Sequence, residues 1–226
     1  MTTMALRAGK QTWALVAKDL LVEWRSKEVF SAMVLYVAVV LVIYNFAFEF
    51  RRDTVAVLAP GVLWSAVIFA GLLGLGRTFA AEQDQGTLDA LLLCPVDRGL
   101  IFVGKLLASL LFMLLVQAIT VPVFVTLFDV RLSLPALVPL VVLGSLGFAV
   151  LGTLFAAMAT HTRAREMLLP LLLLPLVVPV VIAGVRGTQV LISGEGSLAV
   201  WLNLLAGFDL IFLGVVYALF EYVLEG

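Results

Sequence analysis

Six long runs of apolar residues, separated by short polar stretches, dominate the pattern of this chain. They cover approximately residues 29–48, 55–76, 100–128, 136–159, 167–184 and 199–223. Because an α-helix rises about 1.5 Å per residue, about 20 apolar residues cross the roughly 30 Å hydrocarbon core of a bilayer. The pattern therefore predicts an all-α polytopic membrane protein with six transmembrane helices.

The residues before the first run have a different pattern. Within residues 10–27, apolar side chains recur at helical spacing, at Trp13, Val16, Ala17, Leu20 and Trp24. Lys18, Asp19 and Arg25 fall on other sides of such a helix. An amphipathic helix with tryptophan at the headgroup level is typical of a segment that lies along the membrane surface. We expect residues 1–28 to form a cytoplasmic, interfacial arm and residues 29–226 the six-span domain. The alternative is that the arm simply extends the first span.

Composition agrees with the membrane class. Of 226 residues, 63% are hydrophobic and 13% are charged, whereas soluble domains carry roughly 25% charged residues. The net charge of −1 gives no indication of nucleic-acid binding. One His, one Cys and no acid paired with a base inside a run predict neither a catalytic nor a metal site.

The basic residues predict the orientation, because Lys and Arg are enriched in cytoplasmic loops. With the N-terminus inside, ten of the fourteen Lys and Arg fall on the cytoplasmic side, namely Arg7, Lys10, Lys18, Arg25, Lys27, Arg77, Arg98, Lys105, Arg163 and Arg165. The other four are Arg51, Arg52, Arg131 and Arg186. We therefore expect both termini in the cytoplasm, with the Arg51–Arg52 pair as the main exception.

Small residues and prolines inside the runs predict how the helices pack. Small residues recur every three or four positions in the second run at Ala66, Ala70 and Gly74, and in the fourth at Ser145, Ala149, Gly152 and Ala156. Such stripes allow close approach of helix backbones in lipid. Pro170, Pro175 and Pro179 predict a bent fifth helix. Beyond it, residues 184–196 are expected to form a short re-entrant or surface hairpin.

Two ionisable residues lie inside or next to the spans. Residues 99–106 resemble a phosphate-binding loop, but Leu106 replaces the required Ser or Thr and the interior is apolar, so we predict no nucleotide site there. Lys105 is expected to extend to the membrane interface or to pair with a neighbouring acid. Asp209 is a functional candidate, since buried acids in a membrane are costly. The alternative is a helix that begins near Leu204, which would leave Asp209 close to water.

Two polar side chains inside the runs carry no charge. Asn45 and Gln117 are expected to form hydrogen bonds between helices rather than to contact a substrate.

A polar, amphipathic segment, residues 77–98, separates the second and third runs. If Thr87 caps a new helical turn after Gly86, then Leu88, Leu91 and Leu92 share one apolar face. Acidic residues would surround this face and select basic partners. We interpret the segment as a docking surface for a cytoplasmic protein; the alternative is an ordinary solvated loop. The candidate contact residues are Glu82, Asp84, Gly86, Thr87, Leu88, Asp89, Leu91, Leu92 and Pro95.

Two single residues are compared with known haem-iron ligands. Cys94 before Pro95 is similar to a haem-regulatory dipeptide, and His161 is the sole imidazole. A lone Cys in a reducing loop and a His among basic residues facing headgroups are more often inert, and we favour that interpretation.

The order Glu82-x3-Gly86-Thr87-Leu88-Asp89-x-Leu91-Leu92-Leu93-x-Pro95, followed by Lys105, resembles the haem exporter protein B (CcmB) family of cytochrome c maturation. The similarity continues through the small-residue stripe of the fourth run and Leu168-Leu169-Pro170 to Val177-Val178-Pro179. Cys94, where the family usually has Ser or an apolar residue, and Asp89, where Glu is commoner, depart from the family pattern. Looser versions of the acidic-Gly-Thr segment occur in ABC-2 type permeases generally.

The resemblance implies an ABC-2 type permease-like fold in the bacterial inner membrane. The chain would be the permease subunit of an ABC transporter, with ATP hydrolysis in a separate cytoplasmic ATPase that docks on residues 77–98. Other implied partners are a membrane haem-handling protein, a small accessory subunit and a periplasmic haem chaperone, within a dimer or hetero-oligomer. Haem is implied as a handled or transported ligand rather than a permanent cofactor, and the ATPase cycle as the driver of chaperone release. Two alternatives stay open: a generic ABC-2 exporter of lipid, drug or glycan, and an ATP-independent membrane scaffold or channel.

Overall fold

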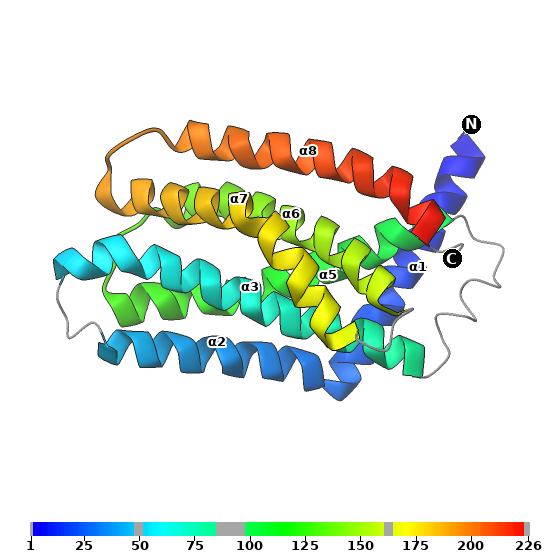
Figure 1. The fold of residues 1–226 in the computed structure, drawn as a ribbon, viewed down its shortest axis with the longest axis horizontal. Coiled ribbons are helices and arrows are strands. Elements are labelled where there is room, and N and C mark those ends of the chain that lie inside the picture. The colour runs from blue at the N-terminus through cyan, green and yellow to red at the C-terminus, as the bar shows by residue number, and fades with distance from the viewer. Residues whose placement is uncertain (1, 48–51, 85–97, 161–164, 224–226) are drawn as a thin grey trace.

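The computed structural model describes residues 2–47, 52–84, 98–160 and 165–223 (Figure 1). Within these residues it contains seven helices and no strand: α1 (Thr2–Ser26), α2 (Glu28–Ala47), α3 (Arg52–Asp84), α5 (Arg98–Phe128), α6 (Leu134–Thr160), α7 (Arg165–Ser193) and α8 (Leu198–Val223). All but α1 are long and apolar enough to cross a bilayer. The prediction of an all-α protein with six transmembrane helices is confirmed.

The six long helices lie side by side, and α6 is at the centre, in contact with α3, α5, α7 and α8. Its residues 148–151 are completely buried. The start of α1 and the end of α8 lie at the same end of the bundle, as an even number of crossings requires (Figure 1). The end of α3 and the start of α5 lie there too, and we call it the termini end.

The first helix, α1, crosses the termini end at a steep angle to α2 (Figure 1). The two helices are separated at Lys27, which has a φ of 54°. The Lys27 N–H donates to the Glu23 carbonyl at 2.6 Å, and the Glu23 carboxylate accepts a hydrogen bond from the Phe30 N–H at 2.7 Å. Phe30 lies in the first turn of α2, whose N–H groups have no partners within the helix. The bend is thus fixed by hydrogen bonds, and α1 is a separate helix rather than a continuation of the first span.

The small-residue stripes are buried between helices. Ala66, Ala70, Gly74, Ser145, Ala149, Gly152 and Ala156 are all buried. A Cβ atom on Gly74 would come within 2.7 Å of the sulfur of Met33 in α2, and one on Gly152 within 2.3 Å of Leu75 in α3. These positions therefore mark helix packing, as the sequence predicted.

A buried tryptophan joins three helices. Trp64 of α3 lies against Gly144 of α6 and Gly184 of α7, and a Cβ atom on either glycine would be 2.4 Å from its ring. The indole N–H donates to the Thr188 hydroxyl at 3.0 Å, and this hydroxyl donates to the Gly184 carbonyl at 2.8 Å. The contact satisfies the only polar atom of the indole inside the bundle.

The fifth transmembrane helix, α7, contains Pro170, Pro175 and Pro179 and changes direction along its length (Figure 1). The predicted bend is confirmed. The predicted hairpin over residues 184–196 is wrong, because α7 stays helical to Ser193. Contact with Trp64 holds residues 184–188 inside the bundle, and the chain turns only at Gly194 and Gly196, with φ values of 73° and 101°.

Two further polar side chains connect neighbouring helices. The Asn45 amide of α2 donates to the Leu127 carbonyl of α5, and the Gln117 amide donates to the Ser145 hydroxyl of α6. Both bonds confirm the predicted roles; Gln117 is buried and Asn45 is partly buried, and lipid offers neither amide a hydrogen-bond partner.

We expect Gly144→Ala to lower the free energy of unfolding by about 1–3 kcal/mol, because the added methyl group overlaps the Trp64 ring. Thermal unfolding in detergent measures the effect. The control is Gly61→Ala, also in a transmembrane helix, where a Cβ atom meets nothing within 4 Å. Equal melting temperatures for both variants would show that the Trp64 contact is not tightly packed.

Candidate functional site

The described ends of the predicted docking segment, residues 77–84 and Arg98, lie at the termini end. Although the apolar span ends at Leu75, α3 continues to Asp84, so the first part of segment 77–98 is helical. Glu82 and Asp84 are in its last turn, but their side chains are outside the described part of the structure. The other candidates, Gly86, Thr87, Leu88, Asp89, Leu91, Leu92 and Pro95, are also outside it, as are Cys94 and His161. Their roles stay predictions.

The first turns of α5, directly after this segment, touch two other helices. A Cβ atom on Gly99 would be 2.8 Å from the Tyr217 hydroxyl of α8. One on Gly104 would be 2.9 Å from Cβ of Leu15 in α1. Only glycine permits such close approach without a shift of the neighbour. The start of α5 is therefore held between the first and last helices of the chain.

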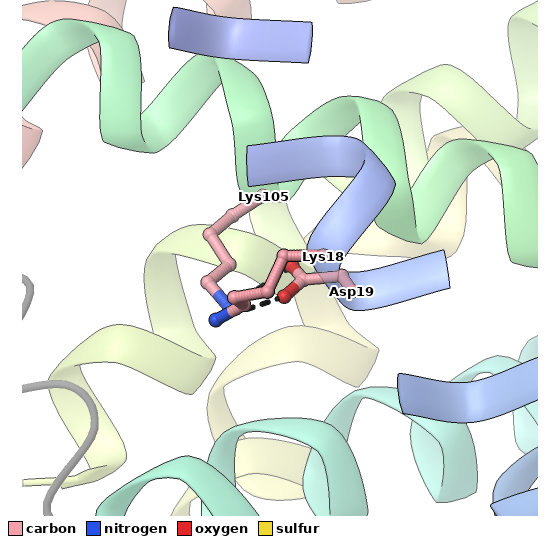
Figure 2. A network of polar contacts seen from close by, with 3 residues as sticks. All are labelled: Lys18, Asp19 and Lys105. Atoms are coloured by element: carbon pink, nitrogen blue, oxygen red, sulfur yellow. Dashed lines mark hydrogen bonds and ion pairs between the residues drawn. The ribbon is translucent and has the colours of Figure 1, made fainter. Parts of the chain in front are cut away.

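A buried ion pair joins α1 to α5 (Figure 2). Lys105 Nζ donates to Asp19 Oδ2 at 3.0 Å, and the two side chains are only 4% and 5% exposed. Lys18 Nζ lies 3.1 Å from the other oxygen of Asp19 and stays partly exposed. Both charges would be costly to bury alone, so each compensates the desolvation of the other.

Three predictions about α1 and the start of α5 can now be compared with the structure. Lys105 pairs with a neighbouring acid, as one alternative proposed. Residues 99–106 form two turns of α5 and not a loop, which agrees with the rejection of a phosphate site. The prediction that Asp19 lies apart from an apolar side shared by Trp13 and Val16 is wrong: Val16 and Asp19 are buried together, whereas Trp13 is 66% exposed. The need of Lys105 for a counter-ion outweighs the apolar pattern of α1.

Asp209 lies deep inside the bundle. Helix α8 begins at Leu198, so Asp209 is about 16 Å along it. The alternative of a helix that begins near Leu204 is wrong. Asp209 is 3% exposed, and in the described part of the chain neither carboxyl oxygen has a hydrogen-bond partner. One oxygen occupies the space that glycine leaves at position 147, where a Cβ atom would be 2.7 Å away.

Among the described residues, no three His, Cys, Asp or Glu side chains are grouped for a metal ion. The structure shows two candidate features. One is the start of α5, which packs against α1 and α8 and is joined to α1 by the Lys105–Asp19 pair; the other is the carboxyl group of Asp209.

We expect Lys105→Met and Asp19→Leu each to lower the free energy of unfolding by about 3–5 kcal/mol, because each change leaves a buried charge without its principal partner. The double variant should recover most of the loss, since two apolar side chains need no compensation. Lys27→Met, at an exposed lysine, is the matched control. Unfolding in detergent, analysed as a double-mutant cycle, measures the coupling. Additive losses would contradict the pairing.

We expect Asp209→Asn to leave the melting temperature unchanged, because the side chain keeps its size and no hydrogen bond is lost. Gly147→Ala should destabilise by about 1–3 kcal/mol, since the new methyl group meets the carboxyl oxygen. The loss should be smaller in an Asp209→Ala background, where that oxygen is absent. An equal loss in both backgrounds would show that Asp209 does not occupy the space beside Gly147.

Comparison with known proteins identifies the family. The profile of the family described as CcmB protein matches residues 10–221, from α1 into the last turn of α8. Heme exporter protein B of Rhodobacter capsulatus is 33% identical over 174 residues, which are 76% of this chain and 79% of that protein. The Paracoccus denitrificans protein of that name is 32% identical over 177 residues (78% and 81%), and the Bradyrhizobium diazoefficiens protein 29% over 199 residues (88% and 90%). This chain belongs to the CcmB family.

Proposed function

We propose that the chain is the membrane subunit of an ABC-type complex that handles haem during maturation of c-type cytochromes. The observation that carries the proposal is the match to the CcmB family over residues 10–221, with relatives named heme exporter protein B. Six helices able to cross a bilayer suit a subunit of a bacterial membrane transporter. Haem is then a handled or transported ligand, with no permanent cofactor.

In this proposal the ATPase pushes on residues 77–98. The segment connects α3 to α5, so movement of the segment displaces the ends of both helices. The start of α5 contacts α1 and α8, and Trp64 joins α3 to α6 and α7. Close-packed interiors transmit displacement, so these contacts carry a push at the termini end into the whole bundle.

ATP hydrolysis is assigned to the partner. Residues 99–106, the part of the chain most similar to a phosphate-binding loop, are helical, and the ammonium group of Lys105 is bound by Asp19. The acids Glu82, Asp84 and Asp89 of the segment would select a basic surface on the ATPase. By resemblance, the further partners are a membrane haem-handling protein, a small accessory subunit and a periplasmic haem chaperone. A second membrane subunit, identical or different, completes the complex.

The basic residues support a cytoplasmic location for the termini end. Two groups of basic residues lie at opposite ends of the described chain. Those toward the termini end are Lys10, Lys18, Arg25, Lys27, Arg98, Lys105 and Arg165, and those toward the other end are Arg52, Arg131 and Arg186. The positive-inside tendency then puts residues 77–98 on the side where an ATPase works. Both termini lie in the cytoplasm in this arrangement.

The test uses a strain that lacks this gene. We expect loss of c-type cytochromes, restored by the wild-type gene but not by Glu82→Lys or Gly86→Pro, because these changes alter the charge or the backbone of the docking segment. The amount of cognate ATPase that co-purifies with each variant should also be at least tenfold lower than with the wild-type protein. Haem staining and quantitative immunoblotting are the measurements.

Glu195→Lys is the matched control, because it makes the same charge change in the exposed turn between α7 and α8, at the other end of the bundle. It should restore cytochromes and retain the ATPase. Normal cytochrome levels in the deletion strain would remove the haem assignment and leave a generic exporter. Undiminished ATPase binding by Glu82→Lys and Gly86→Pro would contradict coupling through this segment.

A further inference from the structure

The rotation of α1 about its own axis is fixed by contacts along one side. Glu23 accepts a hydrogen bond from the first turn of α2 at 2.7 Å. Asp19 binds Lys105 of α5, and the Leu15 side chain packs against α5 at Gly104. A helix held at these positions cannot turn without breaking a buried ion pair. The side chains on its opposite side therefore face away from the bundle.

The opposite side of α1 combines exposed apolar and cationic residues. Six residues fall on this side of a helix with 3.6 residues per turn, and we call them the outward face of α1: Lys10, Trp13, Ala14, Ala17, Leu21 and Arg25. Trp13 and Leu21 are 66% and 59% exposed. Lys10 and Arg25 at its two ends are also exposed, and Lys18 beside it is partly exposed.

The charges of α1 are segregated. The helix contains two acidic residues, Asp19 and Glu23, and both are engaged by the bundle. Its exposed charges are therefore cationic. This arrangement complements an anionic surface that also accepts apolar side chains.

We propose that the outward face of α1 binds anionic phospholipid headgroups at the termini end of the bundle. Helix α1 runs steeply across the bundle axis (Figure 1), so its length lies along the membrane surface rather than through it. Trp13 and Leu21 enter the boundary between headgroups and acyl chains, and Lys10 and Arg25 contact phosphate groups. Tryptophan prefers this depth, and basic residues are attracted to anionic leaflets.

Charge also favours lipid over the ATPase as the occupant. The docking segment carries Glu82, Asp84 and Asp89, which suit a basic ATPase surface. The same basic surface would repel Lys10 and Arg25. The inference does not need haem, but its choice of lipid over the ATPase rests on the proposed docking segment; the cytochrome assay and the depth of the spin label test the two separately.

The test places a spin label on the outward face in the full chain. In a Cys94→Ser background, Leu21→Cys is labelled, and the protein is reconstituted in phosphatidylcholine bilayers with or without phosphatidylglycerol. Accessibility to oxygen and to a water-soluble nickel chelate reports the depth of the label. We expect the label in the lipid when phosphatidylglycerol is present. Lys10→Gln and Arg25→Gln should each reduce the ratio of inserted to water-exposed label about fivefold.

Lys27→Gln is the control, because Lys27 is exposed at the bend but lies outside the outward face. It should leave the depth unchanged, and circular dichroism should show that all variants keep their helices. Three results would overturn the proposal: a label in water with both lipid compositions, insertion that ignores phosphatidylglycerol and both Gln substitutions, or protection from the chelate only after the cognate ATPase is added. The last result would assign this face to a protein.

Discussion

A bilayer offers no hydrogen-bond partners, and this constraint determines which contacts connect the helices. An amide, an indole N–H or an ammonium group inside the bundle must find its partner on another helix, and the described helices provide these partners. Gln117 bonds to Ser145, Trp64 to Thr188, and Lys105 to Asp19. Each bond fixes the rotation of two helices relative to each other. Apolar packing alone would do so less strictly, because lipid tails are about as apolar as leucine.

The same constraint explains what the sequence predicts well. Runs of about 20 apolar residues are long enough to cross hydrocarbon only as helices, so the number and approximate position of the spans follow from hydropathy. Small residues at helical spacing likewise predict close packing, because a stripe such as Ala66, Ala70 and Gly74 has no other evident use in lipid. The fold class and the packing stripes can therefore be predicted from short stretches of sequence alone.

The errors arise where a contact from a distant part of the chain outweighs the local pattern. Residues 184–193 contain Gly, Arg, Thr and Gln, which suggest a turn, but Trp64 is more than a hundred residues away and keeps them helical. The pattern of α1 places Asp19 off the apolar stripe, because nothing near Asp19 in the sequence identifies it as the acid that pairs with Lys105. A search for a counter-ion to Lys105 would have considered Asp19 and Glu23, the two acids of α1. The docking segment itself was predicted from its motif, and its side-chain geometry stays a prediction.

Asp209 differs from the buried polar groups that connect the helices, because no described group bonds to either of its carboxyl oxygens. A buried carboxyl group without a hydrogen-bond partner costs stability, so Asp209 does not hold helices together in the way that Gln117 and Lys105 do. Gly147 leaves room for one oxygen between α6 and α8, so the carboxyl group has a defined place rather than an accidental one. Asp209 is also far along α8 from the contact of Tyr217 with the start of α5, which holds the helix at the termini end. Because α8 is one continuous helix from Leu198 to Val223, a rotation of α8 at the termini end would also change what the Asp209 carboxyl group meets.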